Sequence, residues 1–481
     1  MLDLMGYMDL SSLGRLAVVS RATYVYAHVD DLWKALVVQE MWRRPGQGVQ
    51  TRGGWKTTLR YILGGTSAAD GDPRVSNHVP LKVSGFFSDL LFQPYHCATA
   101  ALRPEWISRN TVDRRVGISP SDFRRLYEEP NRPVVLTDAA KSWPALEKWT
   151  RSKLLAEHRD LRLHAGGLEI ALKDYLRYAE ESKDELPLYV FDKKFVDKCP
   201  ALGQDYDVPD VFPEDLLSVL GDEQRPDHRW LIAGPARSGS SFHVDPNCTS
   251  AWNATVSGKK KWILFPPGET PPGVHPSEDG LDLAAPVSLM EWFLNFYEEC
   301  HDPGRKVCPL ECVVSAGEVV FVPMGWWHCV INLEWSVAIT QNFVSRVNLP
   351  NVIRFLLTKK HLISGLPPDQ RLDLGERFVS ALTAKRPDLG AEEMARRALL
   401  VAVDGRNQSN RRGLKNTAVH RREDDVNKKP RLWAKLKQGA AAVEPSTDDG
   451  SNGEGRAAGG ERSKTGVEGS GSNDFSFGFS F

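Results

Sequence analysis

Residues 241–246 read Ser-Phe-His-Val-Asp-Pro, and a second histidine, His328, ends the stretch Phe-Val-Pro-Met-Gly-Trp-Trp-His at 321–328. Both stretches lie in runs of β-branched and aromatic residues, which favour strands. Side chains two positions apart on a strand share a face, so His243 and Asp245 are expected to point the same way. A distant strand can bring His328 beside them. The pattern therefore predicts two imidazoles and one carboxylate on one face of a sheet.

This ligand set is the one found in non-haem Fe(II) oxygenases, where it leaves three metal positions open. A His-x-Asp triplet with a later histidine also arises by chance. Ordinary histidines in the core or on the surface are the competing interpretation of the spacing alone.

Polar residues on neighbouring strands favour the metal interpretation. Lys260 opens a strand whose same face continues with Trp262 and Leu264, so an ammonium points into an apolar interior. A buried lysine is costly unless an anion meets it, and a bound dicarboxylate would supply that anion. Further polar side chains that can orient a ligand are expected on adjoining strands: Asn253, Thr340 and Asn342. Strand alternation turns Lys259 and Lys261 away from this interior.

Eight short β-type runs, separated by Gly, Pro and Asn turns, surround these residues and predict a double-sheet sandwich or small barrel. They are 228–233, 241–245, 251–256, 260–265, 310–314, 318–322, 327–333 and 336–343. Residues 268–309 form an expected insertion with one helix at 289–299. Outside the barrel we expect strands at 133–136 and 187–191 and helices at 171–181, 352–360 and 391–401. The fold class is α+β.

The motifs around the triad resemble those of the JmjC oxygenases. They are Ser241 to Pro246, Thr249 to Ala254, Lys260 to Pro266 and Phe321 to His328; Trp230, Gly234 to Gly239 and Ala338 to Phe343 narrow the match. The closest resemblance is to the subgroup typified by the bifunctional arginine demethylase and lysyl 5-hydroxylase, and it covers about residues 85–360. It implies a double-stranded β-helix, the jelly-roll or cupin-like barrel, with flanking helices.

The resemblance also implies roles for individual residues. His243, Asp245 and His328 would hold Fe(II), and Lys260 would pair with the distal carboxylate of 2-oxoglutarate, with Thr340 beside it. Further cosubstrate contacts would come from Tyr189, Asn253 and Asn342. Two positions depart from the subgroup: Ser240 replaces a threonine and keeps its hydroxyl, and Met324 replaces a glycine near the mouth of the barrel.

The expected activity is an Fe(II)- and 2-oxoglutarate-dependent dioxygenase reaction, with O2 as the oxidant, on a protein segment that contains Lys or Arg. Lysyl hydroxylation is favoured, and demethylation of N-methyl-arginine or -lysine, on histones or other nuclear proteins, is the alternative within this class. A different class is an F-box substrate adaptor of a cullin ubiquitin ligase, with the barrel as a recruitment module. The intact triad and Lys260 argue against a barrel without activity.

The N-terminal segment 1–45 resembles an F-box, although the usual Leu-Pro entry is missing. Asp9 stands at the N-cap of one predicted helix, and Asp30 and Asp31 precede another. If the resemblance holds, this unit would dock a Skp-family adaptor through an apolar helical face. The alternative is a small helical hairpin packed on the oxygenase.

The expected organisation continues with a linker at 46–84 that holds one ordered piece at 55–63, and a helical and strand flank of the oxygenase at 85–196. The JmjC domain follows at 197–361, then C-terminal helices at 362–402 and a tail at 403–481. Basic residues dominate the first part of this tail, and Gly and Ser dominate the rest, a composition typical of disorder. The basic part predicts a nuclear localisation signal or a weak, salt-sensitive RNA or DNA contact.

Composition excludes several classes of protein. Over 481 residues, 61 Lys and Arg nearly balance 62 Asp and Glu, so there is no global nucleic-acid footprint. Seven cysteines are too few for a disulfide framework. The spacing of Cys300, His301, Cys308 and Cys312 does not favour zinc. No apolar run reaches the roughly 18 residues of a membrane span, and no signal peptide is visible, so the nucleus and the cytoplasm remain as expected locations. The basic stretch of the tail favours the nucleus.

Overall fold

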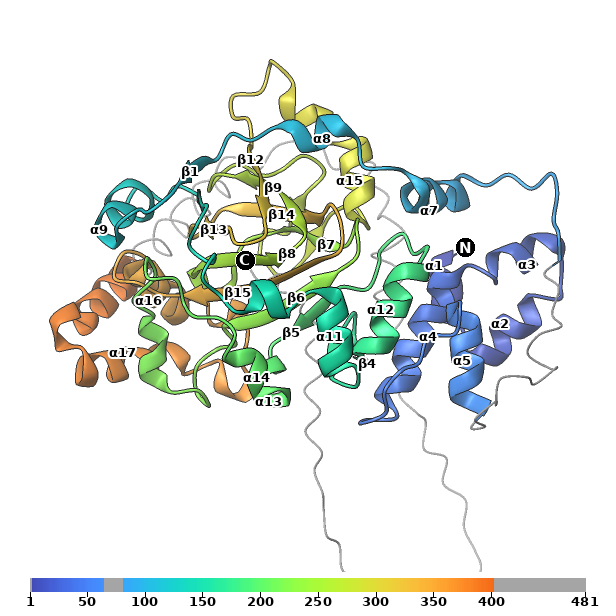
Figure 1. Cartoon of the computed structure of the whole chain (residues 1–481), viewed down its shortest axis with the longest axis horizontal. Coiled ribbons are helices and arrows are strands. Elements are labelled where there is room, and N and C mark those ends of the chain that lie inside the picture. The colour runs from blue at the N-terminus through green and yellow to red at the C-terminus, as the bar shows by residue number, and fades with distance from the viewer. Residues whose placement is uncertain (1, 65–80, 402–481) are drawn as a thin grey trace, which may run out of the picture. The chain divides into compact units, whose positions relative to one another are not determined.

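The computed structural model describes residues 2–64 and 81–401 (Figure 1). Its centre is a nine-stranded sheet in the order β1-β2-β13-β8-β15-β6-β5-β3-β4, antiparallel except for the β1–β2 pair. The strands are β1 (Asp113–Arg115), β2 (Val134–Leu136), β3 (Arg162–Ala165), β4 (Leu168–Ala171), β5 (Val190–Asp192), β6 (Arg229–Gly234), β8 (Ser250–Ser257), β13 (Val319–Val322) and β15 (Ser336–Phe343).

A second sheet of four antiparallel strands, in the order β12-β9-β14-β7, faces the first one. Its strands are β7 (Gly239–His243), β9 (Lys259–Phe265), β12 (Leu310–Ser315) and β14 (Trp327–Asn332). Trp262 and Leu264 of β9 lie in an apolar cluster with Ala251 and Val320 of the large sheet, so this cluster fills the space between the sheets. The cupin-like barrel expected from the sequence is confirmed.

Helices cover the outer faces of both sheets. Ile263 and Phe265 of β9 pack on the far side of the small sheet against α15 (Leu289–Asn295), which lies beside that sheet in Figure 1. Helices α7 (Asp89–Thr99) and α8 (Pro104–Ser108) join this layer through Cys97 and Trp106. The predicted helix at 289–299 was too long: α15 ends at Asn295, and a short 3-10 turn, η4 (Glu298–His301), follows.

The outer face of the large sheet carries the largest apolar cluster. Phe123 of α9 (Pro120–Phe123), which runs into the π-helical turn η1 (Arg124–Glu128), packs edge-on against Phe321 of β13. Tyr175 of α12 (Leu172–Glu181) belongs to the same cluster. Further short elements on this side are α10 (Ala145–Lys148), α11 (Arg151–His158), α13 (Phe195–Lys198) and α14 (Pro200–Gly203). The 3-10 turn η2 (Leu216–Leu220) belongs to a separate apolar cluster with the C-terminal helices.

The N-terminal helices are α1 (Leu2–Gly6), α2 (Leu10–Leu16), α3 (Arg21–Tyr26), α4 (Asp30–Trp42) and α5 (Trp55–Gly64), of which α4 and α5 share this core. Asp9 caps α2 as expected. Trp33 and Val37 of α4 are buried in the cluster that holds β3, β4 and α12. Lys34 pairs with Asp184 at 3.0 Å.

The segment expected as a linker, 46–84, is partly built into the fold. Val49 is 1% exposed and bridges Ile170 of β4, and α5 supplies the ordered piece expected there. The residues that follow, 65–80, lie outside the described part.

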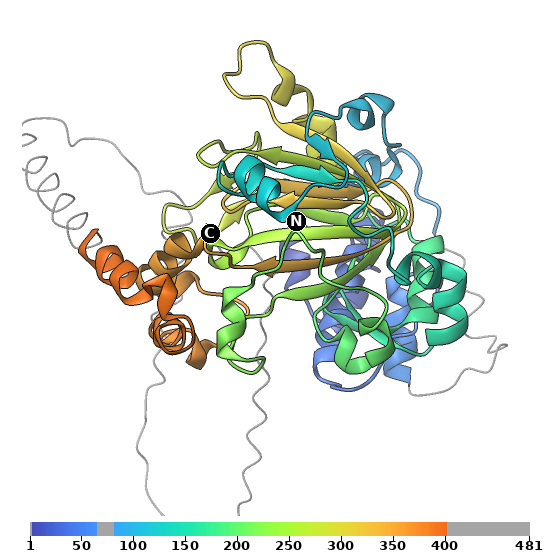
Figure 2. The same cartoon turned by 60° about the vertical axis from the view of Figure 1, so that its left-hand side comes forward.

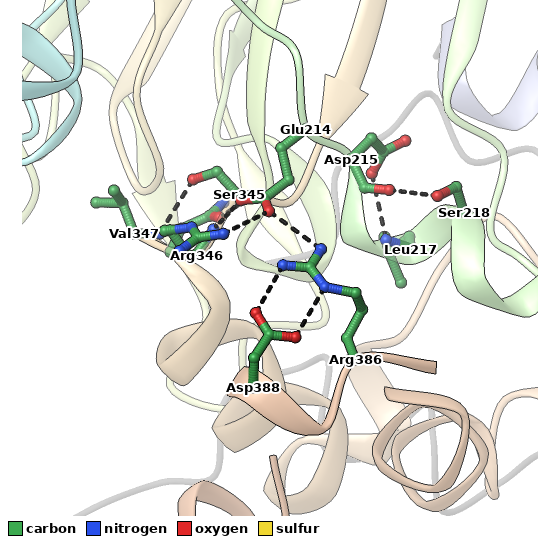
Figure 3. A network of polar contacts seen from close by, with 10 residues as sticks. Glu214, Asp215, Leu217, Ser218, Ser345, Arg346, Val347, Arg386 and Asp388 are labelled. Atoms are coloured by element: carbon green, nitrogen blue, oxygen red, sulfur yellow. Dashed lines mark hydrogen bonds and ion pairs between the residues drawn. The ribbon is translucent and has the colours of Figure 1, made fainter. Parts of the chain in front are cut away.

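Helices α16 (Leu349–Thr358) and α17 (Leu374–Lys385), with residues 391–399, form a helical cluster after β15, in orange in Figure 2. Helix α17 lies within the region 362–402 where C-terminal helices were expected, although no bounds were predicted for it. A polar network ties this cluster to the barrel: the Glu214 carboxylate accepts hydrogen bonds from the Arg346 amide at 2.9 Å and the Arg386 guanidinium at 3.3 Å, and Arg386 also pairs with Asp388 (Figure 3). The basic tail expected beyond 402 lies outside the described residues.

Candidate functional site

The two histidines of the predicted triad lie opposite each other on paired strands, His243 at the end of β7 and His328 near the start of β14. The Nδ1 of His243 lies 2.8 Å from the Ser241 carbonyl, and that of His328 lies 3.1 Å from the Trp326 carbonyl. A carbonyl only accepts, so each Nδ1 carries the hydrogen and each Nε2 presents its lone pair. Backbone contacts therefore set both rings in the tautomer that a metal needs.

Asp245 does not lie on the strand, and the expectation that it follows His243 along β7 was wrong. The strand ends at His243, because Pro246 begins the 3-10 turn η3 (Pro246–Cys248) and Asp245 stands at its N-terminus. The carboxylate nevertheless reaches the histidines: one ligand atom from each of the three residues lies within 4.8 Å of the others. Turn geometry, and not strand alternation, brings it there.

The donor set fits a divalent iron ion. Asp245 Oδ1 accepts a hydrogen bond from the Asn342 amide at 3.3 Å, while its Oδ2 is buried with no hydrogen-bond partner among the described residues. A buried carboxylate oxygen without a partner is costly unless a cation meets it. Two imidazole nitrogens and one carboxylate are the ligands of the facial triad.

Burial tunes these groups for metal binding. It lowers the pKa of both His243 and His328 to about 4, in His243 with help from the neighbouring His328. Burial also raises the pKa of Asp245 to about 6. At neutral pH the imidazoles are therefore neutral and the carboxylate is mostly ionised, which are the protonation states that coordinate a metal.

Lys260 points into the space between the sheets, as predicted. Its side chain is 1% exposed, and Nζ donates a hydrogen bond to the Tyr189 hydroxyl at 2.9 Å. Burial lowers its pKa to about 7, and no described carboxylate pairs with it. A buried ammonium without an anion fits the distal carboxylate of 2-oxoglutarate, because that carboxylate would restore the charged form. The structure thus brings Tyr189 and Lys260 together.

The other predicted cosubstrate residues occupy the same interior. Asn253 of β8 lies opposite Thr340 of β15, and its Oδ1 is buried with no partner among the described residues. Thr340 donates to the Trp252 carbonyl at 3.1 Å. Ser240 lies opposite Val330, beside an irregularity in the β7–β14 pairing. Each of these three side chains can contact a ligand between the sheets.

Asn342 has a different immediate role from the one expected. Its amide donates to Asp245 Oδ1 and, at 2.9 Å, to the Thr249 hydroxyl, so it holds a metal ligand in place. One polar residue of the interior escaped the sequence analysis: Asn332 lies opposite Lys260 and donates to the Ser238 hydroxyl at 3.0 Å. Its place four residues after His328 on the same strand face was the available signal.

Lys261 points away from the barrel interior, as expected, but it is not exposed. It is 1% exposed and pairs with the equally buried Glu311 of β12 at 2.8 Å. Its ammonium also donates to the Arg109 carbonyl at 2.7 Å, and Glu311 further accepts from Tyr297. Among the described residues the triad is the one cluster arranged to hold a metal, so His301 and its neighbouring cysteines form no zinc site there.

Comparison with known proteins agrees with this geometry. Residues 120–348 match the model of the cupin-like domain. The chain is 47% identical over 390 residues to the arginine-specific demethylase JMJ22 of Arabidopsis thaliana, which covers 80% of this chain and 75% of that one. It is 36% identical over 295 residues to the bifunctional arginine demethylase and lysyl-hydroxylase psr-1 of Caenorhabditis elegans (58% and 70% covered).

The name of a third relative states its cosubstrate and its metal. The human 2-oxoglutarate and iron-dependent oxygenase JMJD4 is 31% identical over 266 residues, covering 50% of this chain and 62% of that one. The cupin-like barrel, the triad and these relatives agree. This chain belongs to the JmjC family of iron- and 2-oxoglutarate-dependent oxygenases.

Proposed function

We propose that this oxygenase acts on arginine or lysine side chains of proteins, with removal of N-methyl groups from arginine as its leading activity. The observation that carries this proposal is the 47% identity to an arginine-specific demethylase over most of both chains. The bifunctional name of psr-1 supports lysyl hydroxylation, which the sequence alone favoured, as the second activity.

Each residue of the site has a defined task. When bound, iron and 2-oxoglutarate supply the oxidation of a substrate C–H bond, with O2 as the oxidant and succinate and CO2 as the coproducts. His243, Asp245 and His328 would hold the metal. Lys260 and Tyr189 would receive the distal carboxylate of 2-oxoglutarate. Apolar side chains such as Trp262 and Val330 exclude water.

The fate of the substrate depends on which carbon is oxidised. An oxidised N-methyl group leaves as formaldehyde and releases the demethylated nitrogen, whereas an oxidised lysyl carbon keeps its hydroxyl. We would incubate the enzyme with peptides that carry methylated arginine, unmodified arginine or lysine, and measure peptide mass, formaldehyde and succinate. Loss of a methyl group with formaldehyde supports demethylation, and gain of one oxygen on lysine supports hydroxylation. Peptides unchanged in mass, with succinate formed at the peptide-free rate, would refute both.

We also propose that the N-terminal helices dock a Skp-family adaptor. Four apolar side chains on and beside α1 and α2 are exposed: Leu4 (70%), Tyr7 (90%), Val18 (85%) and Val19 (70%). Exposed apolar side chains on a helical unit are what docking through an apolar helical face requires. Co-purification with the adaptor, compared between the wild type and a variant with polar residues at Tyr7 and Val18, tests this partner.

A nuclear location and a weak nucleic-acid contact remain proposals that rest on the basic stretch 406–437. Removal of that stretch should abolish both nuclear accumulation and any salt-sensitive RNA binding. Unchanged distribution of the shortened chain would refute the nuclear signal.

A further inference from the structure

A tight turn lies just before His328, the third residue of the metal triad. Residues 323–326 connect β13 to β14, and His328 is the second residue of β14. The Trp326 amide donates to the Pro323 carbonyl at 3.3 Å, and Gly325 takes the left-handed φ of +78° that this turn requires. The Trp326 carbonyl accepts the Nδ1–H of His328 at 3.1 Å. The conformation of this turn therefore sets the orientation of the imidazole.

One residue from a distant segment holds the turn at two points. Asn131 lies between η1 and β2, and its side-chain amide donates to the Met324 carbonyl at 3.0 Å. Its own carbonyl accepts the indole N–H of Trp326 at 2.8 Å. The two contacts lie on either side of Gly325, and Trp326 is 7% exposed, so water does not readily replace them.

The backbone of Asn131 is suited to this place. Its φ is +55°, a left-handed value that asparagine tolerates better than most residues. Its backbone N–H donates to the Glu128 carbonyl at the end of η1. A residue that served only to end η1 would need the backbone conformation alone. The side-chain contact to Met324 is additional to that need.

We propose that Asn131 is a positioning residue of the metal centre. It holds the turn of residues 323–326 so that the Trp326 carbonyl fixes the His328 imidazole with Nε2 directed at the metal. Groups that orient a metal ligand typically change metal affinity 10- to 100-fold when they are removed. Asn131 acts one contact further away, so we expect a smaller effect of roughly 3- to 10-fold.

The test separates the side chain from the backbone. Asn131→Gly keeps the left-handed φ and the carbonyl but removes the amide, and Asn131→Asp keeps the size but replaces the donor with an acceptor. Trp326→Phe removes the indole donor. Asn110→Ala is the matched control, because the Asn110 side chain accepts from Val313 of β12 at 2.8 Å, a strand without a triad residue.

The readouts are the affinity for Mn(II) without cosubstrate, the ligand-field spectrum of the Co(II) form and the melting temperature of the metal-free protein. The Asn131 variants and Trp326→Phe should weaken Mn(II) binding and alter the Co(II) spectrum. The double variant Asn131→Gly/Trp326→Phe should weaken Mn(II) binding by less than the product of the two single fold changes, because both contacts hold one turn. Asn110→Ala should change only the melting temperature. Should Asn131→Gly fail to fold, Asn131→Asp and Trp326→Phe carry the same test. Wild-type Mn(II) affinity and Co(II) spectra in these variants would overturn the proposal.

Discussion

Replacement of Lys260 by methionine should stabilise the cosubstrate-free protein while weakening its affinity for 2-oxoglutarate. The lysine is 1% exposed, and burial lowers its pKa from 10.5 to about 7. That difference corresponds to on the order of 5 kcal/mol against the charged form, as an upper limit. Methionine keeps the apolar stem and removes this cost, while the lost hydrogen bond to Tyr189 returns only about 1 kcal/mol. We therefore expect a higher melting temperature for Lys260→Met without cosubstrate.

The pH dependence gives a second signature with a defined sign. The unfolded chain keeps the lysine proton up to about pH 10.5, whereas the folded chain releases it near pH 7. Between these values the unfolded state binds more protons, so this lysine makes the wild type more stable as the pH rises. The advantage of Lys260→Met in free energy of unfolding should therefore shrink between about pH 7 and about pH 10.

The same substitution that raises stability should weaken the binding of 2-oxoglutarate. A charge-assisted contact contributes about 1.5–3 kcal/mol, so Lys260→Met should raise the 2-oxoglutarate midpoint by roughly one to two decades. Lys260→Arg should recover only part of this loss, because a planar guanidinium does not fit the place of an ammonium. The assay is a 2-oxoglutarate titration followed by succinate. Equal midpoints for Lys260→Met and the wild type would refute the assignment of the cosubstrate site.

The neighbouring lysines are the controls. Lys259 is exposed, so Lys259→Met should change neither stability nor the midpoint. Lys261→Met leaves Glu311 buried without its partner and should cost about 3–5 kcal/mol of stability while the midpoint stays unchanged. Lys261 is therefore a control for binding but not for folding.

Asp245→Ala should abolish Mn(II) binding and succinate formation without lowering the melting temperature of the metal-free protein, because it removes a buried oxygen that has no partner; succinate at the wild-type rate would contradict the metal assignment. A chelator should abolish succinate formation, and Fe(II), but not Zn(II), should restore it; activity that survives chelation would speak against an iron enzyme. Serine at both Tyr7 and Val18 should abolish adaptor binding and preserve succinate formation, and retained co-purification would dismiss the docking surface. Deletion of residues 1–45 is a poor substitute for this variant, since Trp33 and Val37 belong to the shared core.

The barrel strands were predictable because each alternates between two buried faces and ends at a turn residue. The predicted runs and the observed strands differ by at most a few residues at their ends. Within the site, the expectation that Asp245 lies on the same strand as His243 was wrong, because β7 ends before the turn that Pro246 begins. Helix α17 was expected only as part of the helical region 362–402, although Leu374, Phe378 and Leu382 recur at helical spacing, are buried, and could have given its bounds.

Burial on the outer faces could not be predicted in the same way. Alternation indicates that Lys261 points away from the barrel interior, but it does not tell whether another layer covers that side. The cover comes from α8 and α15, which lie far from β9 in the sequence. The same holds for Val49, which read as part of a linker and is buried against β4. Such contacts depend on tertiary packing and leave no local pattern.

The two buried lysines of β9 also specify how this strand is aligned with its neighbours. A slip of one residue turns every side chain of a strand to the opposite face. In one direction, Lys261 would take the apolar position of Trp262 between the sheets. In the other direction, Trp262 would take the place of Lys261 and leave Glu311 buried without a cation. Either misalignment leaves one charge buried without a partner, which costs several kcal/mol. Lys260, which serves the cosubstrate, and Lys261, which serves the fold, thus both disfavour a shifted register of β9 in the catalytic barrel.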